Sequence, residues 1–390
     1  MTTSTETAEH PPQWAALAGV TAALAMFGAA QGLSYPLFTI LMQRQGLSPG
    51  LIGLSAAMMP VGLILSASFV PMAVRSVGAR NLGVGCAVAG ALCFLAIGYL
   101  QDWVAWFVIR FLIGAAINPL YVLGEVWALS LAPPSRRGRV MGVFNALMGA
   151  GYAAGPLILI AVGTAGWPPF MAVVSGFLLC ALILRAVSAN LTGFGDDGQP
   201  SGGIAGFARL APALLLAVLV SAAAQQSTYS LMPVFGLAYG LPEAKLAALV
   251  TALSFGNIIL QIPLGLLAER FGARPMILSC AAATAGCAIF LPMAITTPFV
   301  WLVLVVMGAV GYGVYTMALI ELGSRFRGSA LVAGNAAFAL MWGVGGIVGP
   351  PGAGALMQAA GPLGLPAVIA GLEALLVAFA FYRSVSRRNA

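Results

Sequence analysis

The chain has 390 residues, of which 61% are hydrophobic and only 7% are charged, and its mean hydropathy is +1.00. A soluble globular protein carries about 25% charged residues, so this composition excludes a cytosolic enzyme, a disordered protein and a secreted disulfide scaffold. Uncharged stretches long enough to cross a bilayer, which takes about 20 residues, recur along the whole chain. The sequence therefore predicts an all-α polytopic membrane protein, because a β-barrel would show short alternating segments instead.

The net charge of +7 arises from 17 Lys and Arg residues against 10 Asp and Glu residues. The positive residues stand in short clusters between hydrophobic stretches, which is typical of topology signals. We therefore expect these positive residues to orient the protein in the lipid bilayer, and we expect no nucleic acid as a partner. The uncharged run over residues 11–43 is far longer than a signal-peptide core of about 7–15 residues, and it holds the first span.

Twelve membrane spans are predicted from the uncharged runs and the Gly-, Pro- and Arg-rich loops between them. They cover residues 15–42, 51–73, 81–100, 104–131, 140–162, 169–187, 208–237, 244–268, 275–295, 299–322, 329–357 and 364–382. With both termini in the cytosol, the outer loops hold only Arg44 and Lys245, whereas fourteen arginines lie on the inner side. This positive-inside bias predicts that both termini are cytosolic.

A segment rich in Gly, Ser, Asp and Pro separates the sixth predicted span from the seventh. Such a composition is typical of a flexible linker. The predicted domains are a cytosolic tail over 1–14, a six-helix bundle over 15–187, a linker over 188–207, a second six-helix bundle over 208–382 and a tail over 383–390.

An internal repeat relates the two halves at one constant offset without gaps. Gln31 falls on Gln225, and Gly155-Pro156 falls on Gly349-Pro350. Tyr35 likewise falls on Tyr229 and Tyr121 on Tyr315. Because each half begins on the cytosolic side, the repeat is parallel, and it predicts two pseudo-symmetric six-helix bundles related by an axis along the membrane normal.

Three motifs resemble those of the major facilitator superfamily, and the resemblance covers essentially the whole chain. The segment GLLAERFGAR (265–274) is similar to the loop signature of that family, whereas in the equivalent segment 71–80 Arg75 stands where the acid is expected. RFLIG (110–114) and GYAAGP (151–156) resemble two further family motifs, and residues 124–142 resemble a bacterial subfamily with undefined substrates. The resemblance implies a transporter of the bacterial inner membrane in which these motifs act as gates, and we expect it to be a monomer. The candidate gating residues are Gly265, Glu269, Arg270, Gly272, Arg274, Gly151, Gly155 and Pro156.

The fourth predicted span carries two ionisable residues, which are costly inside a bilayer and are functional candidates by default. At 100° per residue, Arg110, Asn118, Tyr121 and Glu125 fall within one stripe about 80° wide, which predicts that they line an aqueous cavity. Arg110 could instead be a scaffold residue that bonds backbone carbonyls, and Glu125 could be an anchor at the cytosolic end.

The resemblance places the first, fourth, seventh and tenth helices around a central cavity. Polar and aromatic candidates on the other three helices are Gln31, Tyr35, Gln225, Gln226, Tyr229, Tyr312 and Tyr315. Aromatic rings with a few hydrogen-bonding groups suit an amphipathic organic molecule. The alternative is that these groups only bond between helices.

Protons are the expected coupling ion, although the first span holds no carboxylate and His10 is the only histidine. The candidate proton carriers are Glu125 and, mid-span in the twelfth helix, Glu373. Glu321 next to Arg325 is interpreted as an interfacial salt bridge. We expect no metal and no cofactor, because the five cysteines fall on peripheral helices by the resemblance and the chain lacks a phosphate-binding loop with its lysine.

These features predict a secondary active transporter, and not an enzyme, that works by alternating access. We expect it to export a small amphipathic organic compound in exchange for protons. The second hypothesis is uptake of a small organic anion bound at Arg110. A third, of another class, is a membrane sensor or assembly factor that does not transport.

Overall fold

The computed structural model describes residues 14–132, 137–187 and 203–386, and all regular secondary structure in these residues is α-helical. The helices are α1 (Trp14–Arg44), α2 (Pro49–Ala67), α3 (Val70–Val77), α4 (Ala79–Tyr99), α5 (Trp103–Leu131), α6 (Arg137–Val162), α7 (Pro168–Val187), α8 (Gly203–Leu210), α9 (Pro212–Ala238), α10 (Glu243–Ile259), α11 (Gln261–Phe271), α12 (Ala273–Ala294), α13 (Val300–Arg325), α14 (Gly328–Ala360) and α15 (Gly364–Ser386). Within the described residues, eleven helices are long and apolar enough to cross a membrane, or twelve if α10 and α11 are one bent span. This confirms the polytopic helical fold.

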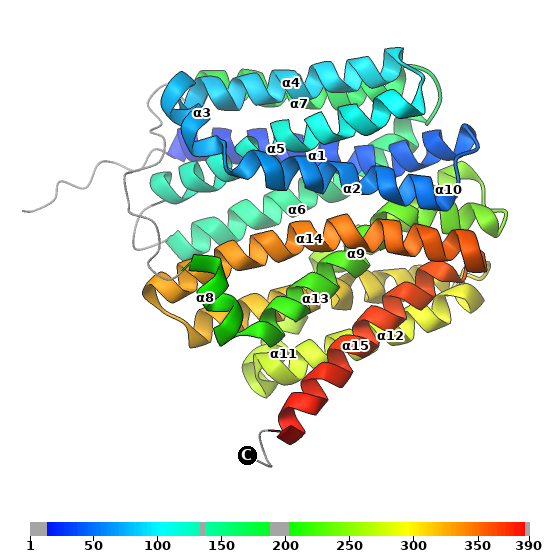
Figure 1. Ribbon diagram of the computed structural model, residues 1–390. Coiled ribbons are helices and arrows are strands. Elements are labelled where there is room, and N and C mark those ends of the chain that lie inside the picture. Colours follow the sequence, from blue (N-terminus) through cyan, green and yellow to red (C-terminus); the bar gives the residue numbers. More distant parts are fainter. Residues whose placement is uncertain (1–13, 133–136, 188–202, 387–390) are drawn as a thin grey trace, which may run out of the picture.

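The helices before residue 188 stack against those after residue 202 (Figure 1). Following the predicted orientation, we call the end of the bundle that carries Arg44 and Glu243 the outer end and the opposite end the inner end. The short helices α3, α8 and α11 all lie toward the inner end in Figure 1.

Two predicted spans are interrupted near their inner ends. The second stops at Ala67 and resumes as α3 at Val70, and the eighth is bent by 43° between α10 and α11. Pro71 and Pro263 lie in the first turns of the resumed helices. Because proline has no backbone N–H and clashes with the preceding turn, an uninterrupted helix is unfavourable at both places.

The internal repeat is visible in the way the helices touch. A Cβ on Gly62 would overlap the carbonyl oxygen of Phe111, and a Cβ on its repeat partner Gly256 would overlap that of Val305, the repeat counterpart of Phe111. The same holds between α2 and α5 at Gly114 and Met59, and between α10 and α13 at Gly308 and Leu253. In both halves these glycines let two helix backbones meet directly.

The two halves contact each other most extensively through α2 and α14. A side chain on Gly53 would overlap the carbonyl oxygen of Pro350, and one on Gly354 would overlap that of Pro49. Pro49 begins α2 and Gly354 is in the last turns of α14, so these contacts lie toward the outer end. The outer ends of the halves are therefore closed against each other.

Helix α8 begins inside the range that the composition assigned to the linker. Residues 188–202 are outside the described residues, but Gly203–Leu210 is helical. Phe207 is buried and packs edge-on against Phe326, with the ring centroids 5.1 Å apart. Phe207 thus anchors this short segment on the bundle, which composition alone did not indicate.

Candidate functional site

Arg110 lies in the outer part of α5 and is almost completely buried, with 1% of its surface exposed. Its guanidinium donates to Ser55 Oγ of α2 at 3.2 Å and lies over the Phe38 ring of α1, 4.6 Å from the centroid. Its Nε has no hydrogen-bond partner among the described residues. The arginine thus sits between α1, α2 and α5 with a donor left over, and among the described residues no carboxylate forms an ion pair with it.

Gln31 and Asn118 are buried in the same half and also keep unused polar atoms. Gln31 Nε2 contacts Met59 Sδ at 3.7 Å, while its Oε1 and Asn118 Nδ2 have no partner among the described residues. Unsatisfied buried polar atoms are uncommon in folded proteins and call for an explanation. A ligand, or another conformation of the two halves, would supply partners for them.

Tyrosines from both halves form a cluster at their interface. Tyr152 of α6 packs edge-on against Tyr229 of α9, with centroids 5.8 Å apart, and lies 6.1 Å from Tyr35 of α1. Beside them, Thr39 Oγ1 donates to the backbone oxygen of Ser230 across the interface at 2.6 Å. Tyr152 was missed from the sequence, although it lies inside the GYAAGP motif.

A second aromatic cluster lies on α13 and α14. Tyr315 packs 4.8 Å from Trp342 and 5.5 Å from Tyr312. Gln226 of α9 donates to the backbone oxygen of Trp342 at 3.3 Å. Tyr121 of α5 is within electrostatic reach of Tyr312 and Tyr35, so predicted residues of the first, fourth and tenth spans lie in the same region of the bundle.

The two predicted proton carriers have opposite surroundings. Glu125 is exposed, toward the inner end of α5, and lies within electrostatic reach of Tyr121 and Tyr315. Glu373 is fully buried in α15, and neither carboxyl oxygen has a partner among the described residues. Gln225, another predicted site residue, lines a small cavity together with Tyr229 and with Ile369 of α15.

The loop signature at the inner end contains one ion pair. Arg274 Nε donates to Glu321 Oε1 at 2.6 Å, whereas Arg325 is 3.9 Å from the same oxygen. The interpretation of Glu321 as a salt-bridging residue holds, but its nearer partner is Arg274 of α12 and not Arg325. Helix packing decides this, because it brings the start of α12 beside the end of α13.

The remaining gating candidates are backbone features or exposed groups. Gly272 has φ +87°, and its repeat counterpart Gly78 has φ +81°, a region that favours glycine. Gly265 has open space around it, while Glu269 and Arg270 are exposed.

The glycine motif of α6 packs directly on α1. A Cβ on Gly151 would overlap the carbonyl oxygen of Ala25, and Gly155 is just as close to Ala29 and Leu33. Pro156 follows inside α6 and is buried. These residues set the contact between two helices that each carry a tyrosine of the interface cluster.

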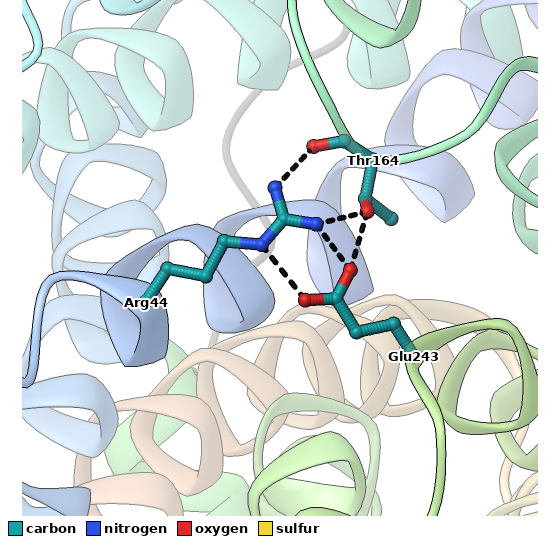
Figure 2. A network of polar contacts seen from close by, with 3 residues as sticks. All are labelled: Arg44, Thr164 and Glu243. Atoms are coloured by element: carbon teal, nitrogen blue, oxygen red, sulfur yellow. Dashed lines mark hydrogen bonds and ion pairs between the residues drawn. The ribbon is translucent and has the colours of Figure 1, made fainter.

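A polar network that was not predicted joins the halves at the outer end (Figure 2). Arg44 Nε donates to Glu243 Oε1 at 2.8 Å, and a second guanidinium nitrogen contacts Glu243 Oε2. Thr164, between α6 and α7, accepts from Arg44 at its backbone oxygen at 2.8 Å and donates from Oγ1 to Glu243 Oε2 at 2.6 Å. The signal was a lone Arg and a lone Glu in short outer loops, which the charge count treated as topology only.

Both halves of the chain match the same protein family. A sequence profile of the Major Facilitator Superfamily matches residues 20–246 and, a second time, residues 214–390. The chain belongs to the major facilitator superfamily. The two overlapping matches agree with the internal repeat, and they show a membrane transporter rather than an enzyme.

The relatives are bacterial proteins of the same superfamily. The uncharacterized MFS-type transporter YfkF of Bacillus subtilis (strain 168) is 25% identical over 346 residues, which cover 85% of this chain and 86% of that protein. The uncharacterized MFS-type transporter YcaD of Escherichia coli O139:H28 is 27% identical over 281 residues, 70% of this chain and 69% of that protein. The chain is thus similar to relatives that share its family and specify no substrate.

Solved structures share the fold. A mutant of the nucleoside transporter NupG aligns with a TM-score of 0.78 and 14% sequence identity over 94% of this chain and 99% of that one. A D-xylose-proton symporter aligns with a TM-score of 0.72 and 15% identity over 95% and 97%. The protein therefore has the fold of these structures, and its family match makes it a secondary transporter.

Proposed function

We propose that this transporter exports a small amphipathic organic compound by alternating access and in exchange for protons. The observation that carries the proposal is the interface cluster, in which Tyr35, Tyr152 and Tyr229 meet from both halves. Tyrosine offers a large apolar face with one hydrogen-bonding group. Such a lining, with the amides of Gln225 and Gln226 nearby, suits an amphipathic cargo better than a strongly charged one.

Glu125 is the proposed proton carrier. It is exposed, and it lies within electrostatic reach of Tyr121 and Tyr315 on the two sides of the interface. A carboxyl group in this place can exchange protons with water on the inner side while it senses what occupies the aromatic cluster. The predicted orientation, with both termini in the cytosol, makes that water cytosolic.

Because the outer end is closed, we assign separate residues to the gate on the outer side and to the gate on the inner side. We propose that the Arg44–Glu243–Thr164 network closes the outer side, and that the segment Gly265–Arg274 with Glu269 acts at the inner side. The glycines of α6 let α1 and α6 move as a pair. Alternating access then requires one end to open as the other closes.

Flux assays in vesicles of reconstituted protein test the main proposal. A series of fluorescent amphipathic cations and neutral dyes is loaded, and export is followed with and without an imposed pH gradient. Gradient-dependent movement of at least one of these compounds is expected. If none of the compounds moves although the orientation and folding of the protein are verified, the export proposal is wrong. Binding of a compound without its movement would favour the sensor hypothesis.

Uptake of a small organic anion is the second candidate, and the state of Arg110 favours it. A buried guanidinium without a carboxylate partner among the described residues is costly, and an anionic ligand would compensate it. The same vesicles discriminate the candidates when aromatic and aliphatic carboxylates are offered outside. Accumulation of a carboxylate, with no export of cationic or neutral dyes, would favour the anion importer.

A further inference from the structure

Glu373 is a carboxyl group in an environment without charge. It lies in the middle of α15, has no exposed surface, and neither of its oxygens has a hydrogen-bond partner among the described residues. Buried carboxylates are normally paired with a cation or coordinate a metal. Glu373 does neither within the described part of the chain.

The helices packed on α15 offer no cation to it. α15 packs on α9, α12 and α14. Helices α9 and α14 contain no charged residue at all, and the only charged side chain of α12, Arg274, is bonded to Glu321 at 2.6 Å. The titratable groups on these helices are Cys280 and Cys287 of α12 and Tyr229 of α9, and Cys280 lies within electrostatic reach of Glu373. In such surroundings the carboxyl group is stable only with its proton bound.

A small cavity lies about one helical turn from this carboxyl group. It has a volume of about 20 Å³ and its surface is mostly apolar, with Gln225, Thr228 and Thr284 among the polar residues of its lining and Ile369 contributed by α15. It is large enough for one water molecule, to which these polar side chains can bond. Ile369 is one helical turn before Glu373, a rise of about 6 Å. On α12, which runs antiparallel to α15, Thr284 is one turn beyond Cys280 and bonds its backbone oxygen at 2.8 Å.

The same cavity extends to a residue at the interface of the two halves. Its lining includes Tyr229, whose ring packs on Tyr152 of the other half. Gln225, in the same lining, is itself one of the residues predicted to contact cargo. The lining thus includes both Ile369, one turn from Glu373, and Tyr229, at the interface.

We propose that Glu373 is a proton-binding site inside the C-terminal half, and that it exchanges its proton with the interface through this cavity. The step is a proton transfer alone: the carboxyl O–H bond breaks, the proton passes to water and then to solvent, and one negative charge stays on α15. Since the dry core cannot hold that charge, release of the proton must be accompanied by entry of water around α15. Proton release would thereby loosen the packing of α15 on α9 and α12.

This inference deepens the proposed function, on which it rests only where proton release is linked to transport. It adds a second proton site, buried within the C-terminal half, to the exposed site at Glu125 toward the inner end of α5. The two sites differ in one testable respect. Glu125 is exposed and should exchange its proton freely, whereas the proton of Glu373 must pass through the cavity.

The experiment reads the proton directly and needs no cargo. Full-length protein in lipid nanodiscs is titrated over the range from acidic to alkaline pH, and the carbonyl stretch of protonated carboxyl groups is recorded by infrared difference spectroscopy. We expect a band that persists at neutral pH, declines at alkaline pH, is absent in Glu373→Gln and remains in Glu125→Gln. The route is tested with Thr284→Val, which should slow the deuterium exchange of this band by about tenfold or more while leaving its titration in place.

A second measurement on the unmodified chain covers the case that Glu373→Gln does not fold. A hydrophobic carbodiimide reacts with protonated buried carboxyl groups, so mass spectrometry should find Glu373 labelled at neutral pH and progressively less as the pH rises. The proposal is overturned if the band survives in Glu373→Gln, if neither band nor labelling changes with pH, or if Thr284→Val exchanges as fast as wild type. Absence of gradient-driven flux in wild-type vesicles would overturn the proposed function alone, since band and labelling do not depend on transport.

Discussion

Arg44 and Glu243 form an ion pair between the end of α1 and the start of α10, with Arg44 Nε 2.8 Å from Glu243 Oε1 (Figure 2). The two residues are 199 positions apart in the sequence. One belongs to each half of the molecule, and Thr164 holds both of them. The pair therefore acts at the point where the halves must separate if the outer side is to open.

Removing one charge of this pair should favour opening of the outer side. In Arg44→Gln or Glu243→Gln we expect the ratio of closed to open molecules to fall by up to about fivefold, because the pair is more than a third exposed and such pairs contribute at most about 1 kcal/mol. Distances between spin labels at Gln101 and Ala359, on opposite halves, measure this ratio once the native cysteines are replaced.

The matched control is the exchanged pair, with Arg44→Glu and Glu243→Arg together. It keeps the attraction and reverses its direction, so the closed population should return toward the wild-type value. High salt should weaken the wild-type pair and have less effect on the single variants. Equal distance distributions in all four proteins would show that the network does not hold the outer end.

We expect that the outer end can close only if residue 53 has no side chain. In Gly53→Ala the new Cβ would overlap the carbonyl oxygen of Pro350, and backbone atoms cannot move aside as a flexible side chain can. Overpacking of this kind costs about 1–3 kcal/mol, so the same spin labels should report a shift toward outer-open molecules of about tenfold or more. Gly85→Ala of α4, where a Cβ meets open space, is the control, and an equal shift in it would contradict this account.

The repeat predicts equal losses of stability at two glycines. Gly114→Ala and Gly308→Ala each place a Cβ on the carbonyl oxygen of the equivalent residue, Met59 or Leu253. Each variant should lose about 1–3 kcal/mol of stability, seen as a lower thermal unfolding midpoint in detergent. Gly286→Ala, where nothing lies within 4 Å of the new Cβ, should match wild type. A loss confined to one half would show that the contacts are not energetically equivalent.

Glu125→Gln should uncouple transport from the pH gradient. The amide mimics the protonated acid, so gradient-driven export of the identified cargo should disappear while exchange of labelled for unlabelled cargo persists. Asp102→Asn is the matched change on the same helix. Asp102 caps α5 by accepting from Val104 N and Ala105 N, a role that asparagine also fills, and this variant should remain coupled. Retained coupling in Glu125→Gln would shift the assignment to Glu373.

The variant Arg110→Leu distinguishes two roles of Arg110, binding of an anionic cargo and support of the helix packing. The repeat counterpart of Arg110 is Leu304, so leucine already occupies the equivalent place in the other half. Because replacement of a buried charge by an apolar residue is often neutral or stabilising, the folded protein should survive and anion uptake should be lost in both Arg110→Leu and Arg110→Lys. Unchanged uptake would exclude Arg110 from the binding of cargo.

Hydropathy and charge determined the membrane class and the approximate spans, and short motifs in the sequence carried the family resemblance. These properties depend on apolar runs long enough to cross a bilayer and on loop composition, which are local in the chain. The constant offset between the halves also indicated which helices are equivalent, and the paired glycine contacts follow that offset. Cavity-facing candidates such as Tyr35 and Tyr229 came from helical periodicity in the same way, and their role in binding stays a prediction.

Only the tertiary structure decided which side chains meet. Arg44 with Glu243, Arg274 with Glu321, and Tyr152 with Tyr229 are pairs from helices far apart in the sequence. These contacts depend on how each helix is rotated about its axis and shifted along the membrane normal. Helical periodicity and hydropathy determine neither. Glu373 shows the same dependence. Its sequence position marked it as costly, but only the packing of α9, α12 and α14 around it leaves the carboxyl group buried and, among the described residues, without a hydrogen-bond partner.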